Sequence, residues 1–171
     1  MTAQAIKAAE VTRKVNVAGC QRMPLRRMAK ASCLMATQID AGTHFTRLTQ
    51  AYDLFERSNA ALWVGDEAMG FQPEQRQAVL RSLQAIDTLW IGYSNIVTDV
   101  IDAGTVEADR MEPMSEASVS VLMLMNRVVN QTARSYGSVL QDVPMALIII
   151  IDVAGHQRRL TQKTMKETCL L

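Results

Sequence analysis

The sequence contains few aromatic residues, few glycines and few prolines. Aromatic residues make up 5% of the 171 positions, and there are 8 glycines and 4 prolines. Sheet proteins are enriched in aromatic and β-branched residues and need frequent turns, so this composition favours helices. The hydrophobic fraction of 49% supports one domain with a buried core and argues against intrinsic disorder.

The sequence has few cysteines, and its positive and negative charges nearly balance. The formal net charge is +1, which argues against a general nucleic-acid-binding protein. The three cysteines, Cys20, Cys33 and Cys169, are too few for a disulfide framework, and we expect them to be free, buried thiols. A disulfide between Cys33 and Cys169 is the alternative, and it requires that their segments lie side by side in an oxidising compartment.

Motifs that carry catalysis or bind metals are absent from the sequence. Its two histidines, His44 and His156, belong to different predicted helices, and no H-x-x-x-H, C-x-x-C or E-x-x-H spacing occurs. The nucleophile elbow and the phosphate-binding glycine loop are also missing. We therefore predict no enzymatic activity, no cofactor and no metal site, and we expect His44, in the first turn of a helix, to be solvated.

No segment of the sequence has the length of a membrane span. Residues 1–10 lack the apolar core of a signal peptide, and the longest apolar run is 145–151. A spanning helix needs roughly 20 apolar residues. Taken by itself, the sequence predicts a chain that is neither exported nor inserted in a membrane.

A duplicated segment is the strongest pattern in the chain. Residues 15–35, VNVAGCQRMPLRRMAKASCLM, recur as residues 151–171, IDVAGHQRRLTQKTMKETCLL, and we call these segments box one and box two. Both contain V-A-G-x-Q-R followed by K-x-x-C-L in the same register. Internal repetition of this kind indicates a repeated structural unit.

Each box places one arginine on the apolar stripe of a helix. Arg22 and Arg158 occupy this position, because they continue the three- and four-residue steps of the preceding apolar side chains. A guanidinium cannot lose its proton, so burial requires an anionic or hydrogen-bonding partner. Gly19 and Gly155 lie three residues earlier. A glycine within a helix costs about 1 kcal/mol relative to alanine, which suggests close approach of a backbone or a ligand.

The other basic residues near box one have a simpler interpretation. They are spread around the helix, which predicts a solvated face with one inward arginine. Such a face can also attract a small anion. The cluster comprises Arg13, Lys14, Arg22, Arg26, Arg27 and Lys30.

Box one resembles the signature box of the PilJ/NarX-type sensor domain. The resemblance is carried by V-N-V-A-G-x-Q-R-M from Val15 and R-M-A-K-A from Arg27. That domain is the periplasmic part of type IV pili methyl-accepting chemotaxis transducers and of nitrate/nitrite sensor kinases. In its nitrate-sensing members, the box arginine binds the anion between the parallel first helices of a dimer. This chain departs from the pattern at Pro24-Leu25-Arg26, at Arg159 and at Thr164-Met165.

The resemblance implies a sensor-type module that binds a small oxyanion such as nitrate or nitrite. It also implies a periplasmic location, a homodimer formed through the box helices, and a membrane-bound signalling partner, since no output domain is recognisable. The residues expected to bind the ligand are Arg22, Arg158, Gly19, Gly155, Gln21 and Gln157. The alternative is a structural or interaction bundle in which internal carboxylates neutralise the box arginines.

The expected fold is an all-α antiparallel bundle of four to five long helices, forming a single domain over 1–171. Pro24 removes the hydrogen bond to the carbonyl of Cys20, which predicts a kink inside box one, and Pro113 should stop a short turn. Short loops make successive helices antiparallel, so the first and last helices run parallel and bring the boxes level. Box two either completes this bundle or starts an incomplete second module. The predicted helices cover 2–39, 43–65, 73–104, 115–136 and 142–171.

Overall fold

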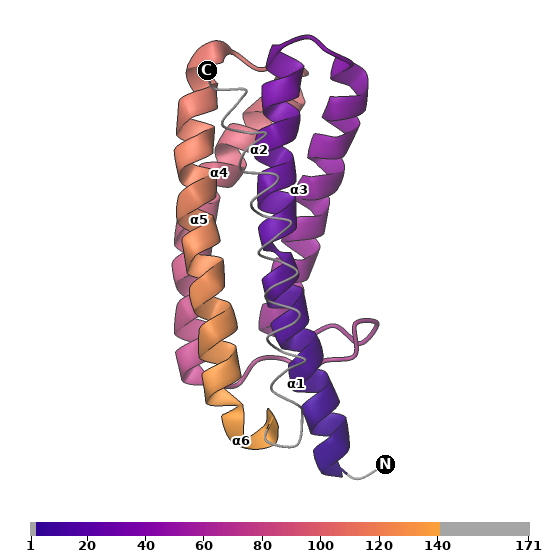
Figure 1. Cartoon of the computed structure of the whole chain (residues 1–171), viewed down its shortest axis with the longest axis vertical. Helices are drawn as coiled ribbons and strands as arrows, with labels where there is room; N and C mark the ends of the chain where they lie inside the picture. The colour runs from indigo at the N-terminus through magenta and orange to yellow at the C-terminus, as the bar shows by residue number, and fades with distance from the viewer. Residues whose placement is uncertain (1–2, 141–171) are drawn as a thin grey trace.

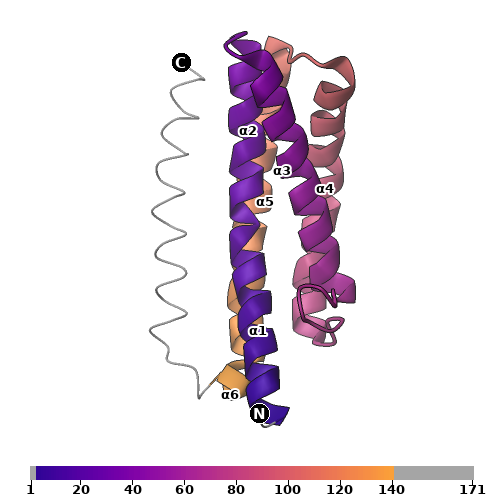
Figure 2. The same ribbon diagram turned by 90° about the vertical axis from the view of Figure 1, so that its right-hand side faces the viewer.

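The computed structural model describes residues 3–140, and this part of the chain is a bundle of antiparallel helices (Figure 1). α1 and α2 follow each other as one long rod that packs against both α3 and α5, and α4 also packs against α3 and α5 (Figure 2). The all-α prediction is confirmed. Residues 142–171, with box two and its predicted parallel pairing, lie outside the described part. The helices are α1 (Ala3–Cys20), α2 (Arg22–Ala36), α3 (Ala41–Val64), α4 (Gln77–Ala103), α5 (Ala108–Ser135) and α6 (Gly137–Leu140).

The rod is interrupted at Gln21, between α1 and α2. The backbone N–H of Gln21 still donates to the carbonyl of Val17 at 3.1 Å. Pro24 has no N–H for the carbonyl of Cys20, so the next helix begins here with the proline in its first turn. The interruption therefore falls inside box one, as the sequence predicts.

The core is formed by apolar stripes that face the bundle axis. The buried residues of α4 follow steps of three and four residues, and they are Val79, Leu83, Ile86, Trp90, Tyr93, Val97 and Val100. Trp90 stacks on Phe55 of α3 with ring centroids 4.0 Å apart. Both rings belong to the core, as expected for aromatic residues at helical spacing.

Two predictions about prolines are wrong. α4 begins at Gln77 rather than Pro73, because the Glu74 carboxylate accepts the N–H groups of Gln75 and Arg76 and keeps the chain extended there. Pro113 lies inside α5, which begins five residues before it at Ala108. Pro113 and Asp109, whose carbonyl loses its partner, are both exposed, so water can bind that carbonyl at little cost.

Two side chains expected in solvent are buried. His44 in the first turn of α3 is 8% exposed, because α2 packs alongside this turn. Lys14 of α1 is 3% exposed and is paired with carboxylates. These expectations were wrong because helix periodicity does not reveal which neighbouring helix covers a polar face.

The cysteines also differ from expectation. Cys20 is a free thiol but is exposed rather than buried. Cys33 is buried and disulfide-bonded, so a free thiol was the wrong expectation there. Cys169 lies outside the described residues.

Candidate functional site

Arg22, the arginine of box one, is buried at the junction of α1 and α2. The residue is 4% exposed, which confirms its predicted inward position. Its Nε donates to the carbonyl of Gly19 at 2.9 Å, and its Nη1 donates to Oδ1 of Asn126 at 2.7 Å. Both acceptors are neutral oxygens. The guanidinium thus joins the helix interruption to the middle of α5.

Within residues 3–140 the surroundings of Gly19 leave room for a small side chain, and an approach by box two lies outside the described residues. A Cβ added to Gly19 would meet the Nη2 atom of Arg22 at 3.6 Å, which is an ordinary van der Waals distance. Within residues 3–140, no backbone of another helix comes within 4 Å of that point. In this part of the chain, the contact between Gly19 and Arg22 is the hydrogen bond that the Gly19 carbonyl accepts, and it does not depend on the absence of a side chain at Gly19.

Gln21 points toward a different helix from Arg22. Its side chain is buried, and its Nε2 donates to the carbonyl of Phe55 at 3.3 Å. Ser58 donates to its Oε1 at 3.0 Å. Gln21 therefore contacts α3, whereas Arg22 contacts α5. The two predicted ligand residues of box one are neighbours in sequence, but their side chains diverge.

The remaining predicted ligand residues belong to box two. Arg158, Gly155 and Gln157 lie outside the described residues, so their expected position beside box one stays a prediction.

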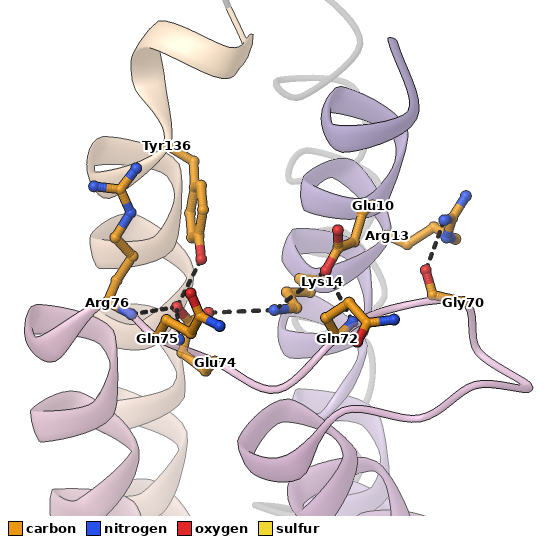
Figure 3. A network of polar contacts seen from close by, with 9 residues as sticks. All are labelled: Glu10, Arg13, Lys14, Gly70, Gln72, Glu74, Gln75, Arg76 and Tyr136. Carbon is orange, nitrogen blue, oxygen red and sulfur yellow. Dashed lines mark hydrogen bonds and ion pairs between the residues drawn. The ribbon is translucent and has the colours of Figure 1, made fainter. Parts of the chain in front are cut away.

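A second buried polar cluster, which the sequence analysis missed, is centred on Glu74 (Figure 3). Lys14 Nζ lies 3.6 Å from Oε2 of Glu74 and 3.6 Å from Oε1 of Glu10. The hydroxyl of Tyr136 donates to Oε1 of Glu74 at 2.7 Å. Burial, together with this hydrogen bond, raises the pKa of Tyr136 above its ordinary value. We call Lys14, Glu74 and Tyr136 the Glu74 cluster.

The loop between α3 and α4 is held against α1 by two further contacts (Figure 3). Arg13 donates to the carbonyl of Gly70 at 2.7 Å, and the N–H of Gln72 donates to Glu10 at 2.9 Å. The guanidinium of Arg76 lies over the ring of Tyr136, 5.0 Å from its centroid. Helix periodicity alone cannot predict this cluster, because its members come from α1, the loop and the end of α5.

The described helices were compared with two further kinds of site, a metal centre and a membrane span. Within residues 3–140, no three His, Cys, Asp or Glu residues gather where they could coordinate a metal ion. Over the same residues, every helix is too short or too polar to cross a bilayer. The arrangement of buried Arg22 at a helix junction is instead suited to holding helices together and to contacting an anion.

Comparison with known protein families identifies one match. The PilJ family, described as Type IV pili methyl-accepting chemotaxis transducer N-term, matches residues 3–111. This range holds box one, Glu74 and all of α4. No curated protein and no solved structure matches the chain significantly. The match spans well over half of the chain, so the chain belongs to the PilJ family of chemotaxis-transducer sensor domains.

Proposed function

We propose that this sensor-type domain recognises a small oxyanion such as nitrate or nitrite through Arg22. The observation that carries the proposal is the burial of a permanently charged guanidinium at the junction of α1 and α2. Guanidinium groups present planar donors that match planar oxyanions. By the internal repeat, Arg158 would supply the second guanidinium, with Gln157 and the backbone at Gly155 beside it.

Binding at Arg22 would alter the packing of the helices. The guanidinium now joins α1 and α2 to α5 through Gly19 and Asn126. An anion that competes with these acceptors would change the contact between the helices, and a ligand shifts an equilibrium only through such differential contacts. Gln21 would assist only after leaving Phe55 and Ser58, so we assign it a secondary role.

Membership of the family also supports a proposal about location and partners. We infer that the domain works in the periplasm, where disulfide bonds persist, and the bonded state of Cys33 is consistent with such a compartment. Signal output would pass to a membrane-bound partner, and the box helices would pair two copies of the domain. The domain would act by binding, without a catalytic step, a cofactor or a metal.

The second candidate is a purely structural bundle. The observation that favours it is that Arg22 and Gln21 both already bond to neighbouring helices. In the form predicted from sequence, carboxylates would neutralise the box arginines. The acceptors described above for Arg22 within residues 3–140 are an amide oxygen and a carbonyl oxygen, and these hydrogen bonds between elements would contribute to the structural role.

Thermal unfolding in nitrate, nitrite, sulfate and chloride at constant ionic strength distinguishes the two candidates. A ligand present at 100 times its Kd stabilises the folded state by about 2.7 kcal/mol. We expect nitrate or nitrite to raise the Tm of the parent protein but not that of Arg22→Ala. Arg81→Ala, at an exposed position of α4, is the matched control and should respond as the parent does. If no anion raises the parent's Tm, the structural candidate stands.

A further inference from the structure

A groove on the surface between α2 and α3 gathers basic side chains. Its volume is about 560 Å³, within the range of small-molecule sites. Among the described residues that line it, none is an Asp or a Glu. The polar lining residues are Arg27, Lys30, His44, Arg47, Gln50 and Arg57.

Helix geometry explains why these charges meet. On α3 the groove is lined by Arg47, Gln50, Leu54 and Arg57, which are three or four residues apart and are therefore neighbours along one side of the helix, with His44 three residues before Arg47. On α2, Arg27 and Lys30 are three residues apart. The two helices are antiparallel and packed together, so the two basic faces border the same groove.

The charge is local rather than a property of the whole chain. The formal net charge is +1, yet α2 carries basic residues and no acidic residue. The acidic residues of α3 are Asp53 and Glu56, and neither lines the groove. Glu56 accepts a hydrogen bond from the Trp90 indole of α4. Like charges in one concave site attract anions from solution.

We propose that this groove binds a small organic polyanion with two or more carboxylate or phosphate groups. Arg47 and Arg57 are ten residues apart on one helix, which separates their backbones by about 15 Å. A polyanion with two charged groups can contact both guanidinium groups at once. Between the basic groups the groove is lined by Ala31, Ala51 and Leu54, which suit a short hydrocarbon segment.

The polyanion site is distinct from the anion contact proposed at Arg22. Arg22 is buried and bonded toward α5, while Arg27, Arg47 and Arg57 are exposed. The two sites therefore respond to different substitutions. Because the three arginines are exposed, changing them to glutamine should leave the fold intact.

Isothermal titration calorimetry with citrate and with pyrophosphate, at fixed ionic strength, tests the groove. We expect the parent to bind at least one of the two probes. Arg47→Gln combined with Arg57→Gln should weaken that binding by about tenfold or more, since charge-assisted hydrogen bonds are lost. Arg81→Gln, which removes an exposed charge from α4, is the matched control and should retain the parent's affinity.

Three results would overturn the polyanion site. They are failure of both probes to bind the parent, equal weakening by Arg81→Gln, and binding of vesicles containing an anionic lipid without binding of the soluble probes. Circular dichroism of each variant confirms that the helices are retained, so a loss of affinity reports on the groove.

Discussion

Arg22 donates a 2.7 Å hydrogen bond to Asn126, a residue 104 positions away in the sequence. The bond joins the start of α2 to the middle of α5. The neighbouring residue Gln21 contacts the other adjacent helix, α3. The junction of α1 and α2 is therefore held to both neighbouring helices. If an anion competes for the Arg22 contact, as proposed, it would change how the rod packs against α5.

Replacing Asn126 tests how much this bond stabilises the bundle. Asn126→Ala should lower the free energy of unfolding by about 1–3 kcal/mol, because a buried charged donor loses an acceptor. Urea unfolding followed by circular dichroism measures the change. Asn130→Ala, at an exposed position of the same helix, should change stability by less than about 0.5 kcal/mol. Equal effects of the two substitutions would contradict this role of Asn126.

Glu74→Gln tests the Glu74 cluster. Among the described residues, the substitution leaves Glu10 as the one ion-pair partner of buried Lys14, and it should cost about 3 kcal/mol. Adding Lys14→Met should recover part of this loss, because the unpaired ammonium is then removed. Both variants are compared by urea unfolding. Glu67→Gln, at an exposed position of the loop, is the control, and a loss as large in that variant would refute the cluster's importance.

Gly65 ends α3 in a conformation that side chains avoid. Its φ is +79°, and an added Cβ would lie 2.6 Å from the backbone nitrogen of Pro73. Gly65→Ala should therefore lower the free energy of unfolding by about 1–3 kcal/mol or more. Gly92→Ala, in the middle of α4 with open space around it, should instead stabilise it by about 0.5–1 kcal/mol. We therefore expect Gly65→Ala to lower the Tm and Gly92→Ala to raise it. Shifts of the same sign would contradict this account of Gly65.

Tyr93 should make the stability fall at alkaline pH. Burial raises its pKa well above the ordinary value of 10.0, and its hydroxyl donates to the carbonyl of Leu25 at 3.4 Å. Above pH 10 the unfolded chain releases this proton while the folded protein keeps it. The contribution is thus complete below pH 10 and decreases as pH rises, by up to about 1.4 kcal/mol per pH unit.

Tyr93→Phe removes this contribution. Its stability, measured by urea unfolding from pH 8 to pH 11.5, should fall less steeply than that of the parent. The pKa of Tyr136 is also raised, and this residue is present in both proteins, so the difference between the two slopes isolates Tyr93. Parallel slopes would show that Tyr93 ionises in the folded protein as readily as in the unfolded chain.

Much of the fold could be predicted because helix periodicity is a local property. The stripe of α4 from Val79 to Val100, the glycines that end α3 and α4, and the interruption near Pro24 all follow from neighbouring residues. Pro113 and Pro73 were misread because proline tolerates several positions near a helix start. Whether the chain turns helical there depends on contacts such as the Glu74 carboxylate with the N–H groups of Gln75 and Arg76.

The candidate site was predicted less completely. The inward position of Arg22 follows from its stripe, but nothing local identifies Asn126 as its acceptor or sends Gln21 toward Phe55. The groove of Arg27, Arg47 and Arg57 also went unrecognised, since its two basic faces are separate features in the sequence.

The sequence by itself determined the helices, their inward faces, the buried arginine of box one and the family resemblance. Only the tertiary structure decided which oxygen atoms accept from Arg22, that Lys14 is buried between Glu10 and Glu74, and that basic side chains of α2 and α3 share one groove. The physical reason is that periodicity orients a side chain relative to its own helix. The partner and the cost of burying a charge depend on which other helix packs against it.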